Sequence, residues 1–287
     1  MKNVFLLLLA FSLVGCESTS SGGGSSAEEV RLDGNKFEFG SRVERTIQFY
    51  GIGGTFQVGE TAPEKGESID FTRHQVVEEF DPEYEDGEKA LTHYLIKDDY
   101  TSATWTKKVD PQETFATSPL RGYSLTGRKK GGAWSYSLDR TNVDEEMRKA
   151  LSQVVYDQRA TYPDGLVKVG DSWTRSPEFV NAFLSREVQD VSGSAVFALS
   201  GVERHKGERC AVIDVKIESS GDEILQDGSV TLARIKLKGQ IFLSLESYLE
   251  LDVNLSGEMV GSLVNNGLVR TYTTPIKLLS NEVFLTE

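Results

Sequence analysis

The fold is decided by residues 231–259, which read TLARIKLKGQIFLSLESYLELDVNLSGEM. Apolar side chains occupy alternate positions in residues 233–245 and again in residues 249–259. Successive side chains of a strand point to opposite faces, so this pattern predicts two long strands that each bury one face. A short polar break separates them, and we expect an antiparallel hairpin that bends where Gly239 and Gly257 interrupt the strands.

Shorter alternating runs extend this sheet into both halves of the chain. Residues 123–125 and 134–136 should form a hairpin with residues 128–132 as its exposed turn. Residues 143–155 instead carry an apolar stripe at helical spacing, preceded by Asn142 as the predicted cap. We therefore predict a mainly β fold: a large curved antiparallel sheet, an open or half β-barrel, with one central amphipathic helix. Further strands are predicted at residues 43–50, 91–96, 101–107, 195–202, 211–217, 268–273 and 282–285.

The first residues have the features of an export signal. Lys2 supplies a positive start, residues 4–13 are almost entirely apolar, and the small Gly15 precedes Cys16. The apolar run is too short to span a bilayer, which needs roughly 20 residues. The order Leu13-Val14-Gly15-Cys16 resembles the lipobox of bacterial lipoprotein signal peptides.

That resemblance implies that Cys16 is the lipidation site. Its thiol would receive a diacylglycerol, the residues before it would be removed, and the new amino terminus would gain a fatty acid such as palmitate. Several acyl chains hold a protein firmly on a membrane, because each buried methylene contributes about 0.8 kcal/mol. Glu17 stands where inner-membrane retention signals have an aspartate, so the resemblance implies the outer membrane, with the body facing the periplasm or the cell surface.

Composition divides the chain into three parts. Residues 1–15 are the predicted signal peptide, residues 16–28 the anchored cysteine with a flexible Ser/Gly tether, and residues 29–287 a β-rich body. The body is either one domain or two similar halves joined near a helix at residues 143–160. With 31 basic and 44 acidic residues the net charge is −13, which argues against nucleic-acid partners. Cys210 reads as a small apolar residue of a strand.

A second resemblance concerns residues 167–173, which read VKVGDSW and follow a Pro/Gly turn. The segment resembles a recurring element of exported β-rich bacterial lipoproteins, which implies no known activity. From the residues themselves we interpret Gly170-Asp171 as a turn and Trp173 as an apolar anchor.

The succession of lipobox, tether, curved sheet and helix resembles, in architecture alone, the open-barrel lipoprotein carriers of the Lol type. This resemblance implies an apolar cavity between the sheet and the helix, able to receive acyl chains. The alternative is that the same side chains fill a packed core, as any half-buried sheet requires. The candidate lining residues are Ile235, Leu237, Ile241, Leu243, Leu251, Val253 and Leu255.

Catalytic and metal-binding patterns are not matched. His74, His93 and His205 lie in separate segments without metal-ligand spacing, so neither a metal site nor a cofactor is predicted. Residues 66–70, GESID, lack the last glycine of a nucleophile elbow. The acidic segment of residues 78–88 departs from the calcium-loop pattern and is interpreted as a solvated loop.

We therefore expect a non-enzymatic lipoprotein of the cell envelope, a binding or envelope-maintenance module that includes an apolar ligand or lipid among its candidate cargoes. Its expected partners are the membrane, through the anchor, and either that ligand or an envelope protein. The alternatives are an enzyme whose carboxylates converge only after folding and a structural partner of another envelope protein. An apolar cavity would favour the carrier, convergent buried carboxylates the enzyme, and a packed body with an exposed apolar patch the partner.

Overall fold

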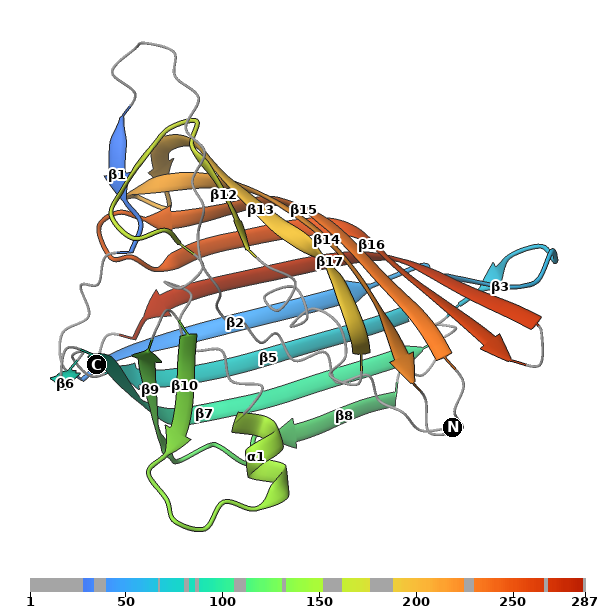
Figure 1. Cartoon of the computed structure of the whole chain (residues 1–287), viewed down its shortest axis with the longest axis horizontal. Helices are drawn as coiled ribbons and strands as arrows, with labels where there is room; N and C mark the ends of the chain where they lie inside the picture. Colours follow the sequence, from blue (N-terminus) through green and yellow to red (C-terminus); the bar gives the residue numbers. More distant parts are fainter. Residues whose placement is uncertain are drawn as a thin grey trace.

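The computed structural model in Figure 1 describes residues 28–33, 40–66, 68–79, 83–85, 88–105, 112–130, 133–151, 162–175, 188–224, 230–265 and 268–285. Within these ranges the chain is mostly strand, with one short helix, so the predicted mainly β class is confirmed. The predicted signal peptide, Cys16 and the tether up to residue 27 lie outside the described residues, as do residues 152–160 of the predicted helix.

The main sheet is antiparallel and follows a strand path that does not close. Four short strands pair beside the path, and β1 (Glu29–Arg31) and β11 (Leu166–Lys168) form a separate two-stranded sheet. The short strands are β3 (Thr55–Val58), β4 (Glu64–Lys65), β6 (Glu83–Glu85) and β8 (Gln112–Thr117). The path runs through β10 (Ala133–Leu138), β9 (Ser124–Lys130), β7 (Glu88–Trp105), β5 (Ser68–Glu79), β2 (Ser41–Gly51), β17 (Leu268–Phe284), β16 (Glu250–Asn265), β15 (Val230–Ser244), β14 (Glu208–Ile224), β13 (Val188–His205) and β12 (Ser172–Arg175).

The hairpin predicted from residues 231–259 is confirmed as β15 and β16, with Ile241 opposite Val253. Its two interior glycines lie where neighbouring backbones come very close. A Cβ atom added at Gly239 would lie 1.9 Å from the carbonyl oxygen of Asn254, and one at Gly257 would lie 1.8 Å from that of Lys236. Both positions therefore exclude a side chain, as expected where a long strand bends.

Several strands are longer than predicted. Residues 91–96 and 101–107 were expected as two strands, yet residues 88–105 form the single strand β7, and residues 268–273 and 282–285 both belong to β17. Pro275 is tolerated inside β17 because it lies where the pairing changes from β3 to β2. The carbonyl of Pro275 accepts the N–H of Ile52 in the connection between those two strands, so its nitrogen faces that break in the pairing.

Two predicted turns are also partly strand. The predicted turn at residues 128–132 is too long, because β9 continues to Lys130 and β10 begins at Ala133. The acidic segment is likewise not simply a loop: Glu78 and Glu79 end β5, residues 83–85 form β6, and Glu88 begins β7. Both segments are rich in charged residues and contain glycine, which explains why the sequence alone indicates loops there.

The helix α1 (Glu145–Leu151) is capped by Asp144 and not by the predicted Asn142. The N–H of Met147 donates to Oδ1 of Asp144 at 2.8 Å, the usual bond from N3 to an N-cap carboxylate. The described helix packs beside β10 at one end of the strand path (Figure 1). Its apolar side chains join a small cluster of their own with Leu95, Leu120 and Leu125.

One face of the main sheet, which we call the inner face, forms the principal core. Strands from β7 to β12 all contribute to a single buried cluster, so the sheet curves round its own side chains. The small β1–β11 sheet packs against this face through Val30 and Val167, together with Leu32 and Tyr162. Strands from both halves of the chain belong to this sheet, because β2, near the start of the chain, pairs with β17, near the end of the chain.

Candidate functional site

The inner face also carries charged and polar side chains, which form a row across four neighbouring strands. Arg45 of β2 lies opposite Glu282 of β17 on one side and Gln75 of β5 on the other. Gln75 in turn lies opposite Asp98 of β7. Because each register pair shares a face, these side chains point to the same side as the core. We call this set, with Arg73, Tyr100, Glu250 and Tyr162, the inner polar row.

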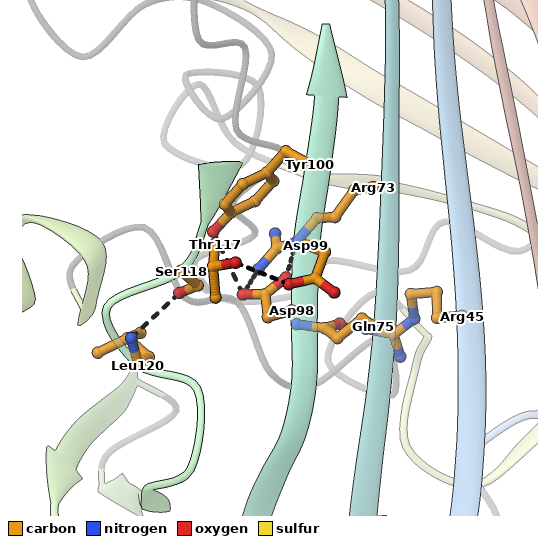
Figure 2. A network of polar contacts seen from close by, with 9 residues as sticks. All are labelled: Arg45, Arg73, Gln75, Asp98, Asp99, Tyr100, Thr117, Ser118 and Leu120. Carbon is orange, nitrogen blue, oxygen red and sulfur yellow. Dashed lines mark hydrogen bonds and ion pairs between the residues drawn. The ribbon is translucent and has the colours of Figure 1, made fainter. Parts of the chain in front are cut away.

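Arg73 and Asp98 form the first part of the row (Figure 2). The guanidinium donates from Nε to Oδ1 and from Nη2 to Oδ2, both at 2.6 Å, which is the two-bond geometry that an arginine and a carboxylate favour. Asp98 is fully buried, and Arg73 is 8% exposed. The hydroxyl of Tyr100 donates to Oδ2 of Asp98 at 3.3 Å, and its ring lies beneath the guanidinium. The buried carboxylate of Asp98 therefore has hydrogen-bond donors on both of its oxygens.

Arg45 and Glu282 form the second part. Nε of Arg45 donates to Oε1 of Glu282 at 2.7 Å, while Nη1 donates to the side-chain carbonyl of Gln75 at 3.3 Å. The other oxygen of Glu282 accepts the backbone N–H of Glu250 at 2.9 Å. The hydroxyl of Tyr162 donates to Oε1 of Glu250 at 2.6 Å. Four strands, β5, β2, β17 and β16, and the segment that precedes β11 are thus joined through side chains.

Burial changes the proton affinity of these groups. Burial raises the pKa of Glu250 to about 7, and the negative charge of Glu282 adds to the rise. The pKa of Tyr162 is well above its ordinary value, first because of burial and then because of Glu250. The pKa of Tyr100 rises to about 12, also chiefly through burial. Glu250 is therefore the member of the row that changes its charge near neutral pH.

Burial limits the reactions that the inner polar row could catalyse. Glu250 is 7% exposed and Glu282 is 2% exposed, and each already holds a hydrogen-bond partner. A substrate group that bound Oε1 of Glu250 would have to replace the Tyr162 hydroxyl. As it stands, the row joins β7, β5, β2, β17 and β16 and holds a titratable carboxyl group between them.

The seven residues predicted to line a cavity all lie on buried strand positions. Six belong to the principal core cluster, and Leu251 belongs to a smaller cluster with Val43, Cys210 and Leu249. None of the seven is more than 6% exposed. The described part of the helix packs in a different cluster, so it does not share a wall with these residues. The seven side chains are thus covered by the protein itself.

The cysteine and two of the histidines considered in the sequence pack against other residues of the protein. Cys210 is fully buried in β14. His205 stacks on Phe242 at 4.1 Å between ring centres, and its Nε2 lies 3.4 Å from a carboxylate oxygen of Asp252. His74 lies against the hydroxyl of Thr46 on the other face of β5. In the described part of the chain no group of three His, Cys, Asp or Glu side chains could hold a metal ion.

The VKVGDSW segment is a strand, a turn and a strand. Gly170 has a φ of 101°, which a residue with a side chain rarely adopts, and its N–H donates to the carbonyl of Leu199. Oδ2 of Asp171 accepts the N–H of Lys168 at 3.0 Å and closes the turn. Trp173 is 3% exposed and stacks on Phe197 with ring centres 5.8 Å apart. The predicted turn and apolar anchor are therefore both observed.

The inner polar row was missed in the sequence because it breaks the alternation used to find strands. β5 places Phe71, Arg73, Gln75 and Val77 on one face, so its core positions read as a mixture of apolar and charged residues. An extended segment with an arginine and a glutamine at alternate positions, beside a strand such as β2 that also alternates Arg45 with apolar residues, is the signal that could have revealed it.

Comparison with known proteins adds no family. No protein-family model matches the chain, and no curated protein matches it either. Among the described residues, no helix combines the length and the apolar character that crossing a membrane requires.

Proposed function

We propose that this chain is a non-enzymatic, lipid-anchored module of a bacterial cell envelope, which acts through its outer surface. The order Leu13-Val14-Gly15-Cys16 supports attachment through Cys16, and the Ser/Gly-rich stretch that follows supports a body held off the membrane by a tether. The glutamate at position 17 supports the outer membrane as the site of attachment.

One observation carries the part of the proposal that concerns binding: the inner face is filled by the protein's own side chains. Its apolar residues are covered without any ligand, and its charged residues pair with one another. Groups that are already satisfied and buried have little to gain from a ligand. This favours a binding or envelope-maintenance role exercised at the outer surface, with another envelope component as the partner.

A lipid carrier is the second candidate, and the open strand path favours it. The path ends at β10 and β12, which do not pair with each other. The β1–β11 sheet packs against the inner face without belonging to the main sheet. The lining residues are buried, so an apolar ligand would have to displace side chains that now pack on them.

An enzyme is the third candidate, favoured by the meeting of Glu250 and Glu282. A carboxyl group with a pKa of about 7 suits acid and base catalysis at neutral pH. Against this, both carboxylates are buried and are bound by Tyr162 and Arg45. Buried ion-pair networks of purely structural role shift pKa values in the same way, so the shift alone does not favour catalysis.

Native mass spectrometry of the mature protein, extracted from bacterial membranes in mild detergent, tests the proposal against the carrier. We expect the mass of the acylated chain alone. A second mass of one phospholipid or fatty acid per chain, lost after extraction with organic solvent, would contradict the proposal and support the carrier.

A further inference from the structure

The hairpin tip between β16 and β17 exposes apolar side chains on both of its faces. Val264 and Leu268 are each 53% exposed and Val269 is 45% exposed. Val264 pairs with Val269 on one face, while Leu268 pairs with Asn265 on the other. A strand at the surface of a sheet normally presents one apolar and one polar face, so apolar exposure on both faces is unusual and points to an apolar surrounding.

The hairpin that carries this tip also differs in charge from the rest of the chain. Of 287 residues 44 are acidic, yet the sequence contains no acidic residue between Glu258 and Glu282. Arg270, exposed next to the apolar residues, is the basic group of the tip. Acidic residues lie on the strands and turns to either side: Glu60 follows Gly59, whose N–H donates to the carbonyl of Val269, and Glu223 of β14 lies two strands away in register with Leu263. The tip itself therefore lacks the negative charge that repels a membrane surface.

An aromatic pair lies behind the apolar tip. Tyr272 of β17 is 42% exposed, and its ring centre lies 4.9 Å from that of Phe56 in β3. Tyr272 lies three positions after Val269, which at about 3.3 Å per residue amounts to about 10 Å. Apolar groups that enter the boundary between headgroups and acyl chains reach about 5–10 Å deep, and aromatic rings prefer the headgroup level.

From this succession we propose that the β16–β17 tip is a second membrane contact, in which Val264, Leu268 and Val269 enter the lipid boundary. Tyr272 and Phe56 then lie at headgroup level, and the guanidinium of Arg270 reaches the phosphates. A protein partner or a second copy of the chain would cover one face of a hairpin, whereas lipid surrounds both faces. This inference rests on the proposed location at a membrane, but it does not depend on Cys16.

Site-specific fluorescence tests the contact in the full acylated chain. Leu268→Cys and Val269→Cys carry an environment-sensitive dye on the two opposite faces, and Glu203→Cys carries it at the opposite end of the sheet, where Glu203 is exposed. Cys210 is buried and should not react. The labelled proteins are reconstituted into vesicles of phosphatidylethanolamine and phosphatidylglycerol that contain nitroxide-labelled lipid.

We expect the dyes at positions 268 and 269 to be quenched several-fold more strongly than the dye at 203, and their emission to shift to shorter wavelength. Quenching no stronger than at position 203 would overturn the proposal. If the emission of only one of the two dyes shifted to shorter wavelength, the proposal would be overturned in favour of a protein partner. If the shift occurred without lipid and grew with protein concentration, it would be overturned in favour of a second copy of the chain. The parent chain separates the two proposals: if it takes up dye, Cys16 is free and the anchor fails, whatever the tip does.

Discussion

Asp98 illustrates how a charged residue is kept inside this sheet. The carboxylate has no exposed surface, and removing an ion from water costs several kcal/mol even after relaxation. Two short bonds from Arg73 and a contact with the Tyr100 hydroxyl offset that penalty (Figure 2). Such a pair is sensitive to the loss of either member, because the remaining charge is then buried alone.

Replacing Asp98 with asparagine should therefore destabilise the protein strongly. We expect Asp98→Asn to lower the free energy of unfolding by about 3–5 kcal/mol, the usual effect of removing one partner of a buried ion pair. Urea unfolding followed by tryptophan fluorescence measures the change.

The neighbouring Asp99 provides a matched control. Its carboxylate lies 3.4 Å from Arg121, whose side chain is 49% exposed, so Asp99→Asn should cost no more than about 1 kcal/mol. Equal losses for the two variants would show that the Arg73–Asp98 pair has no special role.

Glu250 should make stability depend on pH. Its pKa rises to about 7 in the folded protein, above the value of about 4.3 for an unfolded chain. A group with a raised pKa gives its full contribution to stability below its unfolded value and loses it as the pH rises through the folded value. The parent protein should therefore lose stability between pH 5 and pH 8, and Glu250→Gln should remove much of that loss.

Urea unfolding at several pH values compares the parent with Glu250→Gln, whose amide oxygen can still accept the Tyr162 hydroxyl. Glu258→Gln, at an exposed position of the same strand, serves as the control. The prediction is wrong if the parent and Glu250→Gln keep a constant difference in stability from pH 5 to pH 8.

The positions of individual side chains were less predictable from the sequence than the strands or the class of fold. Cys210, Trp173 and the seven apolar residues of β15 and β16 were predicted to be buried, because they follow a regular alternation. Arg73 and Asp98 could not be predicted, since a charged residue in an extended segment is exposed far more often than buried. Their burial depends on β5 lying beside β7, and that pairing is not visible in either segment alone.

Among the elements, the β15–β16 hairpin was predictable and its neighbours were partly so. Long alternating runs specify strands and faces, whereas short runs specify only where a strand is most regular. This is why β7 and β17 were each predicted as two pieces. The cap of α1 was misplaced by two residues, because Asn142 and Asp144 are both good caps and only the backbone decides between them.

The interior glycines of this hairpin permit a direct test of the bend. We expect Gly239→Ala and Gly257→Ala each to destabilise the protein by about 1–3 kcal/mol, because the added methyl group would meet a neighbouring backbone carbonyl. Thermal unfolding followed by circular dichroism measures the change in Tm.

Gly201→Ala is the control for these variants. Gly201 also lies inside a long strand, β13, but an added Cβ would find no atom within 4 Å. Its effect should stay within about 0.5 kcal/mol. If all three variants behaved alike, the close approach of the backbones would not be what requires glycine in the hairpin.

For the whole molecule, the class of fold was predictable and the path of the sheet was not. Alternation indicates strands, but the union of β2 with β17 joins segments more than 200 residues apart, and no local pattern specifies it. The packing of β1 and β11 against the inner face was not predictable for the same reason. The proposed anchor depends only on the first residues and can be tested separately.

Metabolic labelling with radioactive palmitate in a bacterial host tests the anchor. We expect the parent chain to incorporate the label and Cys16→Ser to lose it. Cys210→Ser should keep the label, because that thiol is buried in β14. Label retained by Cys16→Ser would contradict the proposed attachment site.

The central claim is that exposed apolar residues of this protein contact lipid, whereas the apolar residues on the inner face of its sheet bind no ligand. Photocrosslinking tests it most directly: the full chain in vesicles is exposed to a phospholipid with a photoactivatable acyl chain, and labelled residues of the body are mapped by mass spectrometry. The account predicts label at Leu268 and Val269 and none at Ile235, Leu237 or Leu255. Label on those three inner residues would contradict the account and support a lipid carrier.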